Sequence, residues 1–314
     1  MKFWIVGFSF LMISAAFAQG QSGAASPAAG TPLPIQITAK QGIEWRQSDQ
    51  EVIATGSAQA VRGEVTVRAD QLIAHYRKKA TTAADPAATG PAKPAAASDP
   101  ESVLNNGNSE IYEIEAVGNV HISTPTDNAY GDHAVYNMDN AVLVLTGTHL
   151  KLTTLHDVIT ARDAIEYYSV KREAIARGKA LIVADDGRSI TADTLIGYLA
   201  PPPPSGKPVP ATTAKSNNTP DMLGQAGKLQ KVDAIGHVVI HTPTQTATGD
   251  SGVYLPGPDM ARLGGNVHII SGPNQLSGSD ALVNMKTGVA TLLAAPGGQV
   301  AGTVTPNSAP AINK

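Results

Sequence analysis

Histidines are the residues of this sequence that most readily suggest a metal site. The chain has eight, and His237 and His241 are four residues apart. In a strand this spacing places both rings on one face but about 13 Å apart, at ~3.3 Å per residue. His121 and His268 alternate with apolar neighbours, and we expect both to face solvent. No His-Glu-x-x-His segment occurs, so the sequence predicts neither a metal site nor a cofactor.

Six aspartates could supply an acid–base pair, but they recur too regularly for that role. Each follows a glycine by 14 to 16 residues, the glycines being Gly56, Gly118, Gly147, Gly178, Gly236 and Gly265 and the aspartates Asp70, Asp132, Asp163, Asp193, Asp250 and Asp280. A catalytic carboxylate pair is a single constellation, whereas one aspartate per unit is typical of a residue that starts a strand or forms a turn. We therefore expect a structural role.

The segment Gly249-Asp250-Ser251-Gly252 matches the nucleophile segment of trypsin-like serine proteases. The same phase of other units reads Gly131-Asp132-His133-Ala134 and Gly278-Ser279-Asp280-Ala281, and no Ala-Ala-His-Cys segment occurs. The chain has no cysteine, which excludes disulfides, thiolate catalysis and cysteine-bound metals. We expect a protein that is not an enzyme.

Charge and the first residues indicate an exported protein that does not bind nucleic acid. The net charge of −3 over 314 residues provides no basic surface for nucleic acid. Residues 1–18 combine Lys2, an apolar run from Phe3 to Ile13 and the sequence Ala16-Phe17-Ala18. This is the pattern of a secretory signal peptide cleaved after Ala18. Five of the fourteen aromatic residues lie within it, so the mature interior must consist mainly of Val, Ile, Leu and Ala.

The remaining sequence divides into repeats and segments of low complexity. Residues 19–34 are predicted to be a flexible leader, 80–103 a loop insertion, 200–227 a Pro-rich linker or loop, and 294–314 a disordered tail. Elsewhere glycines recur about every 30 residues, and each unit holds two alternating runs of about 10–14 residues. We expect about 12–14 strands and an all-β fold. Glycines inside the runs indicate bulges or bends in a strongly curved sheet.

The phase of the alternation predicts which residues face inward. Apolar residues stand two and four positions after most of the glycines, while the Gly147 unit is shifted by one residue. The predicted inner-face residues are Ile35, Ile37, Ala58, Ala60, Val65, Val67, Val120, Ile122, Leu150, Leu152, Ile165, Ala180, Ile182, Leu195, Val238, Ile240, Val267, Ile269 and Leu282. The pattern does not distinguish a filled core from an open groove.

Several of these segments resemble the OstA-like domain of lipopolysaccharide transport proteins. They include Ala54-Thr55-Gly56, Val65-Thr66-Val67-Arg68-Ala69-Asp70 and Gly131-Asp132-His133-Ala134-Val135-Tyr136. The resemblance covers a domain at 35–199 and further repeats at 228–293, in one continuous unit or two fused ones. It implies an open, twisted antiparallel β-jellyroll.

In that family the inner face holds the lipid A acyl chains of lipopolysaccharide. The resemblance therefore implies that the inner-face residues bind lipid in a periplasmic bridge between the membranes. The implied partners are OstA-like domains of the inner-membrane export complex and of the outer-membrane translocon, with head-to-tail self-association as a further expectation. A β-solenoid protein that binds or degrades an exported polysaccharide is the alternative. It would need clustered carboxylates and stacking aromatics, and only nine aromatic residues follow the signal peptide.

Overall fold

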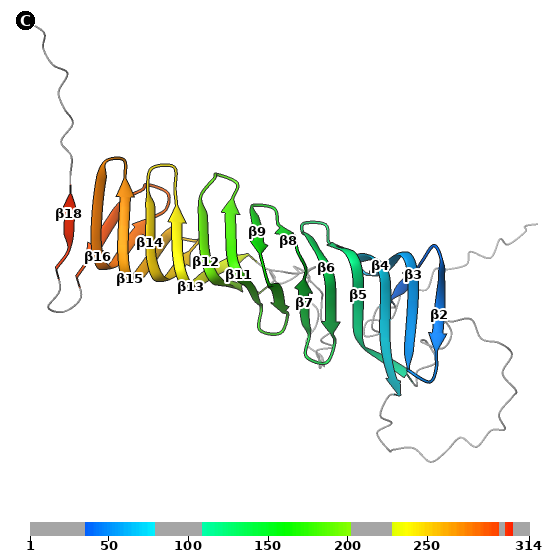
Figure 1. Cartoon of the computed structure of the whole chain (residues 1–314). Helices are drawn as coiled ribbons and strands as arrows, with labels where there is room; N and C mark the ends of the chain where they lie inside the picture. Colours follow the sequence, from blue (N-terminus) through cyan, green and yellow to red (C-terminus); the bar gives the residue numbers. More distant parts are fainter. Residues whose placement is uncertain (1–34, 79–108, 202–227, 295–298, 304–314) are drawn as a thin grey trace, which may run out of the picture. The chain divides into compact units, whose positions relative to one another are not determined.

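A computed structural model of the chain describes residues 35–78, 109–201, 228–294 and 299–303. Every regular element in these residues is a β-strand, and the strands form one antiparallel sheet, which confirms the all-β prediction (Figure 1). Within the same ranges, no helix is long and apolar enough to cross a membrane. The strands are β1 (Gln36–Thr38), β2 (Gly42–Arg46), β3 (Glu51–Arg62), β4 (Val65–Lys78), β5 (Ser109–Ser123), β6 (Asn128–Asn137), β7 (Val142–Thr146), β8 (Leu150–Thr153), β9 (Asp157–Ala161), β10 (Ala164–Tyr168), β11 (Glu173–Ala184), β12 (Ser189–Leu199), β13 (Leu229–His241), β14 (Thr246–Leu255), β15 (Met260–Ser271), β16 (Asn274–Asn284), β17 (Ala290–Leu293) and β18 (Ala301–Thr303).

Several predicted segments fall outside the described residues. These are the signal peptide at 1–18, the leader at 19–34, the insertion at 80–103 and most of the linker at 200–227. The predicted disordered tail at 294–314 needs a correction, because β18 lies within it and pairs with residues 275–277 of β16. Composition alone missed this strand, since the free backbone groups of β16 pair with the tail whatever its side chains are.

The sheet consists of long chain passes, each bent near its middle. Four of the passes are interrupted, so that each consists of two short strands. In each case both short strands pair with the same neighbouring long strand. The interrupted passes are β1 with β2, β7 with β8, β9 with β10, and β17 with β18. Eighteen strands minus four interruptions leaves 14 passes in the described chain. The number of passes lies within the 12–14 expected for strands, whereas the number of strands, 18, is larger because four passes are interrupted at the bend.

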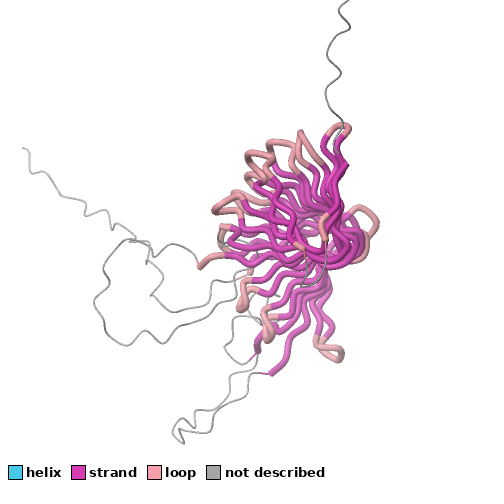
Figure 2. Tube along the Cα trace, turned by 90° about the vertical axis from the view of Figure 1, so that its left-hand side faces the viewer, coloured by secondary structure: helices cyan, strands magenta, loops and turns pink. Residues whose placement is uncertain are grey.

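The bend divides the sheet into two walls. Wall 1 consists of β2, β7, β10 and β17 and the halves of the ten long strands in line with them. Wall 2 consists of β1, β8, β9 and β18 and the other halves. Figure 2 looks along the succession of strands and shows the bend within each pass. We call the edge opposite the bend, where turns of the two walls approach each other, the mouth.

In five passes the bend is a β-bulge formed by glycine and the residue after it. Gly118 has φ of +78° and Asn119 has φ of +48°, and the pairing of β5 with β6 jumps from Val117 to Val120. Two residues of one strand thus oppose one residue of the next, which bends the strand and increases its twist. The other bulges are Gly56-Ser57, Gly178-Lys179, Gly236-His237 and Gly265-Asn266.

The aspartate of the preceding pass fills the space beside the bulge. Asn119 Nδ2 donates to Asp70 Oδ2 at 2.7 Å, and Asn266 Nδ2 donates to Asp250 Oδ2 at 2.9 Å. A Cβ atom at Gly265 would lie 2.5 Å from Asp250 Oδ2. The glycine lies against an aspartate at four of the five bulges, whereas Gly56 lies against the Gln41 side chain. Glycine and aspartate therefore recur together because these bends need a residue without a side chain beside a carboxylate.

The prediction that these aspartates start strands or form turns holds for Asp163, which directly precedes β10, and is wrong for the other five. Asp70, Asp193 and Asp250 lie inside β4, β12 and β14, at the bend. Their hydrogen-bond donors belong to the next pass, so their position becomes intelligible only when two passes lie side by side. Ser251 lies at the same bend, and its hydroxyl contacts the backbone oxygen of Gly264 at 3.5 Å.

Gly265→Ala is expected to destabilise the protein by about 1–3 kcal/mol, the cost of a side chain in a left-handed backbone conformation, and the clash with Asp250 adds to this. Urea unfolding followed by circular dichroism measures the effect. Gly257→Ala is the control, because a Cβ there meets nothing within 4 Å and the backbone is not left-handed. Equal stability of the two variants would contradict this account of the bend.

Candidate functional site: the interior between the walls

Most of the predicted inner-face residues lie between the two walls. Three of the nineteen are partly buried against the apolar clusters, namely Ile35, Ile37 and Ile182. The fifteen that are at most 8% exposed are Ala58, Ala60, Val65, Val67, Val120, Ile122, Leu150, Leu152, Ile165, Ala180, Leu195, Val238, Ile240, Val267 and Ile269. The alternation of apolar and polar residues predicts these inward positions, because successive side chains of a strand point to opposite faces of the sheet.

Leu282 was assigned to the wrong face. Its side chain is 41% exposed, whereas Ala281 and Val283 on either side are fully buried. Successive residues of a strand point to opposite faces, so Leu282 must lie on the outer face of β16. The apolar type of the residue misled the prediction, since the alternation around it places its neighbours inside.

The interior is a filled core rather than an open groove. One cluster joins Leu145 of wall 1 to Ile122 of wall 2, and a second joins Leu263 of wall 1 to Ile269 of wall 2. Ile159 and Ala161 of β9 contact both clusters, which makes the apolar interior continuous along the passes.

On several strands of wall 2 the inward-facing residue beside the bend is smaller than the next one toward the mouth. Beside the bend, wall 2 presents small residues such as Ala58, Ala180 and Ala192, and the next inward position carries residues such as Ile122 and Ile240. On wall 1, by contrast, leucines such as Leu145 and Leu263 lie beside the bend. Small residues of wall 2 therefore leave room at the bend for larger residues of wall 1.

Aromatic residues line the mouth side of wall 1, which the sequence analysis did not anticipate. Tyr136 and Tyr167 belong to one core cluster, Tyr254 packs against the other, and Trp45 and Tyr76 meet at the end near β2. Trp45 Nε1 donates to Tyr76 Oη at 2.6 Å. These rings present an apolar body and a polar tip. Their phase could have revealed them, since Tyr136 and Tyr254 stand two residues after inward-facing Ala134 and Gly252.

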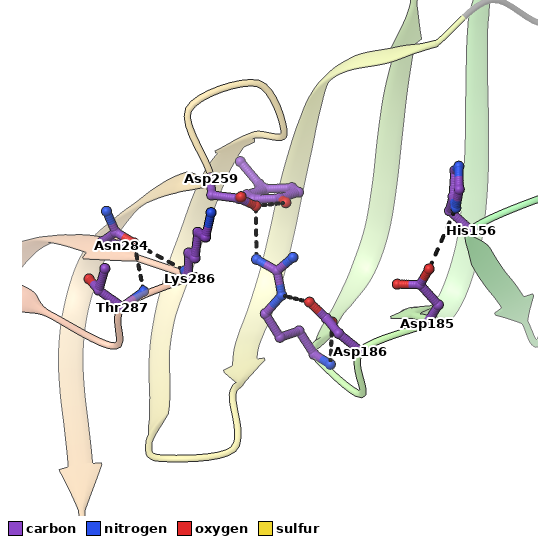
Figure 3. A network of polar contacts seen from close by, with 9 residues as sticks. His156, Asp185, Asp186, Asp259, Asn284, Lys286 and Thr287 are labelled. Atoms are coloured by element: carbon purple, nitrogen blue, oxygen red, sulfur yellow. Dashed lines mark hydrogen bonds and ion pairs between the residues drawn. The ribbon is translucent and has the colours of Figure 1, made fainter.

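A charged contact closes part of the mouth. Arg188 lies in the turn before β12 of wall 2, and Asp259 lies in the turn before β15 of wall 1. The distance from Arg188 Nη1 to Asp259 Oδ1 is 2.8 Å (Figure 3). Arg188 Nε also donates to Asp186 Oδ2, and Tyr254 Oη donates to Asp259 Oδ1 at 3.0 Å. This network joins residues 71 positions apart in the sequence.

The network and its surroundings shift several pKa values. The Arg188 hydrogen bond lowers the pKa of Asp259. Burial, with the hydrogen bond to Asp259, raises the pKa of Tyr254 to about 12. Burial alone would lower the pKa of Arg188, but its two carboxylate partners outweigh burial and raise it. All three groups keep their ordinary charge at neutral pH, so the contact across the mouth is an ion pair there.

A small cavity lies beside this ion pair. Its volume is about 40 Å³, far below the roughly 300–1,000 Å³ of ordinary ligand pockets, and its apolar lining includes Ile182, Ile190, Leu229, Val232 and Met285. The cavity marks a place where the two walls do not pack completely against each other. It is too small for an acyl chain unless the walls move apart.

Two acidic residues of wall 2 have restricted access to solvent at the mouth: Asp127 is buried in a turn, and Asp157, the first residue of β9, is partly buried. Asp127 is 8% exposed, and its backbone N–H donates to Thr124 Oγ1 at 2.9 Å. Asp157 repeats the arrangement with Thr154 at 3.0 Å. Burial raises the pKa of both carboxyl groups, although hydrogen bonds from Thr126 and Thr124 offset part of the effect at Asp127.

The histidines lie apart from the interior. His237 is at a bend, where its Nδ1 lies 2.7 Å from Asp193 Oδ2, and this contact raises the pKa of the imidazole. His241 pairs with Thr246 Oγ1 at 3.0 Å on the outer face of wall 2. Among the described residues, no group of three or more His, Cys, Asp or Glu side chains is placed to hold a metal ion.

Residues 36–173 match the family described as "LptA/(LptD N-terminal domain) LPS transport protein". These residues form an OstA-like domain. The resemblance inferred from the sequence is thereby confirmed, and the passes after the OstA-like match, from β11 to β18, continue the same bent antiparallel pattern.

Two further proteins are similar to this chain. An uncharacterized protein of Rhizobium meliloti (strain 1021) is 27% identical over 147 residues, which cover 46% of this chain and 66% of that protein, just under two thirds of its length. The crystal structure of LptH, the LptA homologous periplasmic component of the lipopolysaccharide transport device of Pseudomonas aeruginosa, is 12% identical. That match covers 57% of this chain and 95% of LptH, with a TM-score of 0.25.

Asp127→Asn is expected to raise the melting temperature at pH 7. A carboxyl group whose folded pKa is raised holds its proton more tightly in the folded state, so its favourable contribution is complete below the unfolded pKa of about 3.9 and is lost as pH rises through the folded value. The gain should therefore shrink on acidification, as thermal melts between pH 3.5 and 7.5 would show. Asp139→Asn is the control with the opposite sign, because the hydrogen bond from Arg77 lowers the pKa of Asp139. A gain that grows toward low pH would contradict the assignment.

Proposed function

We propose that this chain is a non-enzymatic periplasmic carrier that binds lipopolysaccharide and bridges its passage from the inner to the outer membrane. The observation that carries the proposal is the continuous apolar interior, which is aliphatic near the bend and has amphipathic rings at the mouth. The family match of residues 36–173 supports it, because that family is described as a lipopolysaccharide transport protein.

The graded interior suits a ligand with apolar chains and a polar head. Each methylene group left in water costs about 0.8 kcal/mol, so a long acyl chain needs an apolar path across an aqueous compartment. Aliphatic side chains such as Ile122, Ile240 and Ile269 provide that environment. Tyrosine and tryptophan at the mouth match the boundary between the chains and a hydrated head group. The inward-facing residues predicted from the sequence, without Leu282, are the proposed lipid contacts.

Binding in this interior requires the walls to separate. The side chains of both walls fill the space between them, and the cavity beside Tyr254 holds about 40 Å³. Acyl chains would replace contacts between the two walls with contacts between wall and lipid. The apolar surface area that is buried would therefore change little. The ion pair between Arg188 and Asp259 is one contact that must break at the mouth.

The two ends of the sheet are the proposed docking surfaces. In the described chain, β1 and β2 pair only with β3, and β17 and β18 pair only with β16. Such edges have free backbone donors and acceptors, which can take up a strand of another chain. We assign them to OstA-like domains of the inner-membrane export complex and of the outer-membrane translocon, and to head-to-tail self-association.

A disulfide across the mouth is expected to abolish binding of fluorescently labelled lipopolysaccharide. Thr244 lies in a turn of wall 2 and Gly288 in a turn of wall 1, and a Cβ at position 288 would lie 3.8 Å from the Cβ of Thr244. That distance suits a disulfide, and the chain contains no other cysteine. The Thr244→Cys, Gly288→Cys protein should bind when reduced and lose binding when oxidised. The reduced form is its own control, and equal binding in both redox states would refute the separation of the walls.

Photo-crosslinking tests the face of the sheet that contacts lipid. A photoreactive amino acid at Ile122 or Ile269 should give lipopolysaccharide adducts, and one at His121 or His268 should not, because each histidine is on the outer face beside its buried neighbour. Adducts resolved by electrophoresis and immunoblotting provide the readout, and a thermal melt confirms that each variant is folded. Equal adduct yields from both faces would exclude the interior as the lipid site.

A further inference from the structure

Two arginines at the mouth differ in their partners. Arg188 is held by Asp259 and Asp186. Arg172, in the turn between β10 and β11 of wall 1, has a buried Nη1 without any hydrogen-bond partner. No carboxylate of the described residues forms an ion pair with it. A buried charged donor is costly to leave unsatisfied. Gln245 Nε2, in the turn between β13 and β14 of wall 2, also lacks a hydrogen-bond partner among the described residues, but it belongs to a neutral amide. Arg172 therefore presents a positively charged donor at the mouth that has no partner group.

The backbone of Arg172 is firmly placed even though its side chain is unpartnered. Its N–H donates to the Tyr168 oxygen at 2.7 Å, and its own oxygen accepts from the Leu199 N–H at 2.9 Å. Leu199 and Ala174 pack against the first apolar cluster. The guanidinium therefore belongs to a fixed turn at the border of the apolar interior.

The surroundings of this turn favour an amphiphile that carries a negative charge. Lys171 is adjacent, with its ammonium over the Tyr168 ring at 5.3 Å from the centroid, and Val170 is 73% exposed. The nearest carboxylate in sequence belongs to Glu173. In the sheet Glu173 stands beside Tyr168 and Tyr198, on the outer face of wall 1. Two cations beside an exposed aliphatic group match a ligand with an anionic head and apolar chains.

We propose that Arg172 binds the anionic head group, a phosphate or a carboxylate, of the amphiphile whose chains occupy the interior. The inference rests on the proposed function and adds to it the charge of the ligand and the place of its head. A guanidinium forms paired hydrogen bonds with phosphate or carboxylate oxygens. Lys171 adds a second positive charge, and the turn keeps both beside the interior.

The test compares dodecyl phosphate with dodecyl maltoside, which share one chain and differ in head-group charge. Isothermal titration calorimetry of the full chain at pH 7.5, below the micelle concentration of each probe, measures both affinities. Arg172→Met should weaken binding of dodecyl phosphate at least tenfold, the change expected for one charge-assisted hydrogen bond, and change that of dodecyl maltoside less than twofold. Arg172→Lys, which keeps the charge but not the paired donors, should fall between.

Arg177→Met is the matched control, because Arg177 lies in β11, the strand that follows the Arg172 turn, and pairs with Glu166 on the outer face at 2.6 Å. It should change neither affinity. The melting temperature of Arg172→Met should not fall, since the substitution removes an unsatisfied buried donor. Equal weakening of both probes by Arg172→Met, or equal effects of the two methionine variants, would overturn the head-group site and leave the proposed function standing. Failure of the unchanged protein to bind either probe would overturn both.

Discussion

The contact between a glycine bulge and the aspartate of the preceding pass is the interaction on which the structure depends. At Gly118 the left-handed backbone turns the strand, and the Asp70 carboxylate accepts a hydrogen bond from Asn119 in the space that a Cβ would occupy. Without the bend each pass would be one straight strand and the sheet would have no interior. Repetition of the contact along the passes converts a meander into two facing walls.

The packing of the interior follows from this bend. Near it, small residues of wall 2 such as Ala58 and Ala180 accompany larger residues of wall 1 such as Leu263. Farther from it, Ile269 of wall 2 and Tyr136 of wall 1 fill the space between the walls. Apolar burial then holds the walls together, and polar groups such as Arg188 and Asp259 meet where the interior ends in water. A molecule with apolar chains and a charged head would match this order of environments.

The closed interior sets a condition on function. Contacts between aliphatic side chains are not directional, so chains of a ligand can replace them at little net cost. Directional contacts at the mouth, such as the ion pair of Arg188, resist opening more specifically, whereas Arg172 Nη1 has no hydrogen-bond partner among the described residues and is the proposed contact of the ligand. Separation of the walls and recognition of the ligand head group would thus depend on different residues of the mouth, Arg188 and Arg172.

Local pattern was sufficient for much of this description. Alternation with period two predicted the strands and placed residues such as Val120 and Ile240 inside, because a strand exposes its two faces in turn. Recurrent glycines predicted the bulges, since few other residues tolerate a left-handed backbone. The same reasoning failed at Leu282, where an apolar residue type was given more weight than the phase of its neighbours, and at β18, where backbone pairing outweighs composition.

The sequence by itself determined the all-β class, the repeat of about 30 residues, the bends and most of the inner face, because these depend on residues near one another in the chain. Only the tertiary structure decided that the interior is filled, that recurrent aspartates hold bends, and that Arg188 meets Asp259. It also decided that Arg172 Nη1 has no hydrogen-bond partner in the part of the chain that the structure describes. Each of those facts depends on which passes and which walls lie side by side. The alternation of residues within one strand carries no information about which other strand lies beside it.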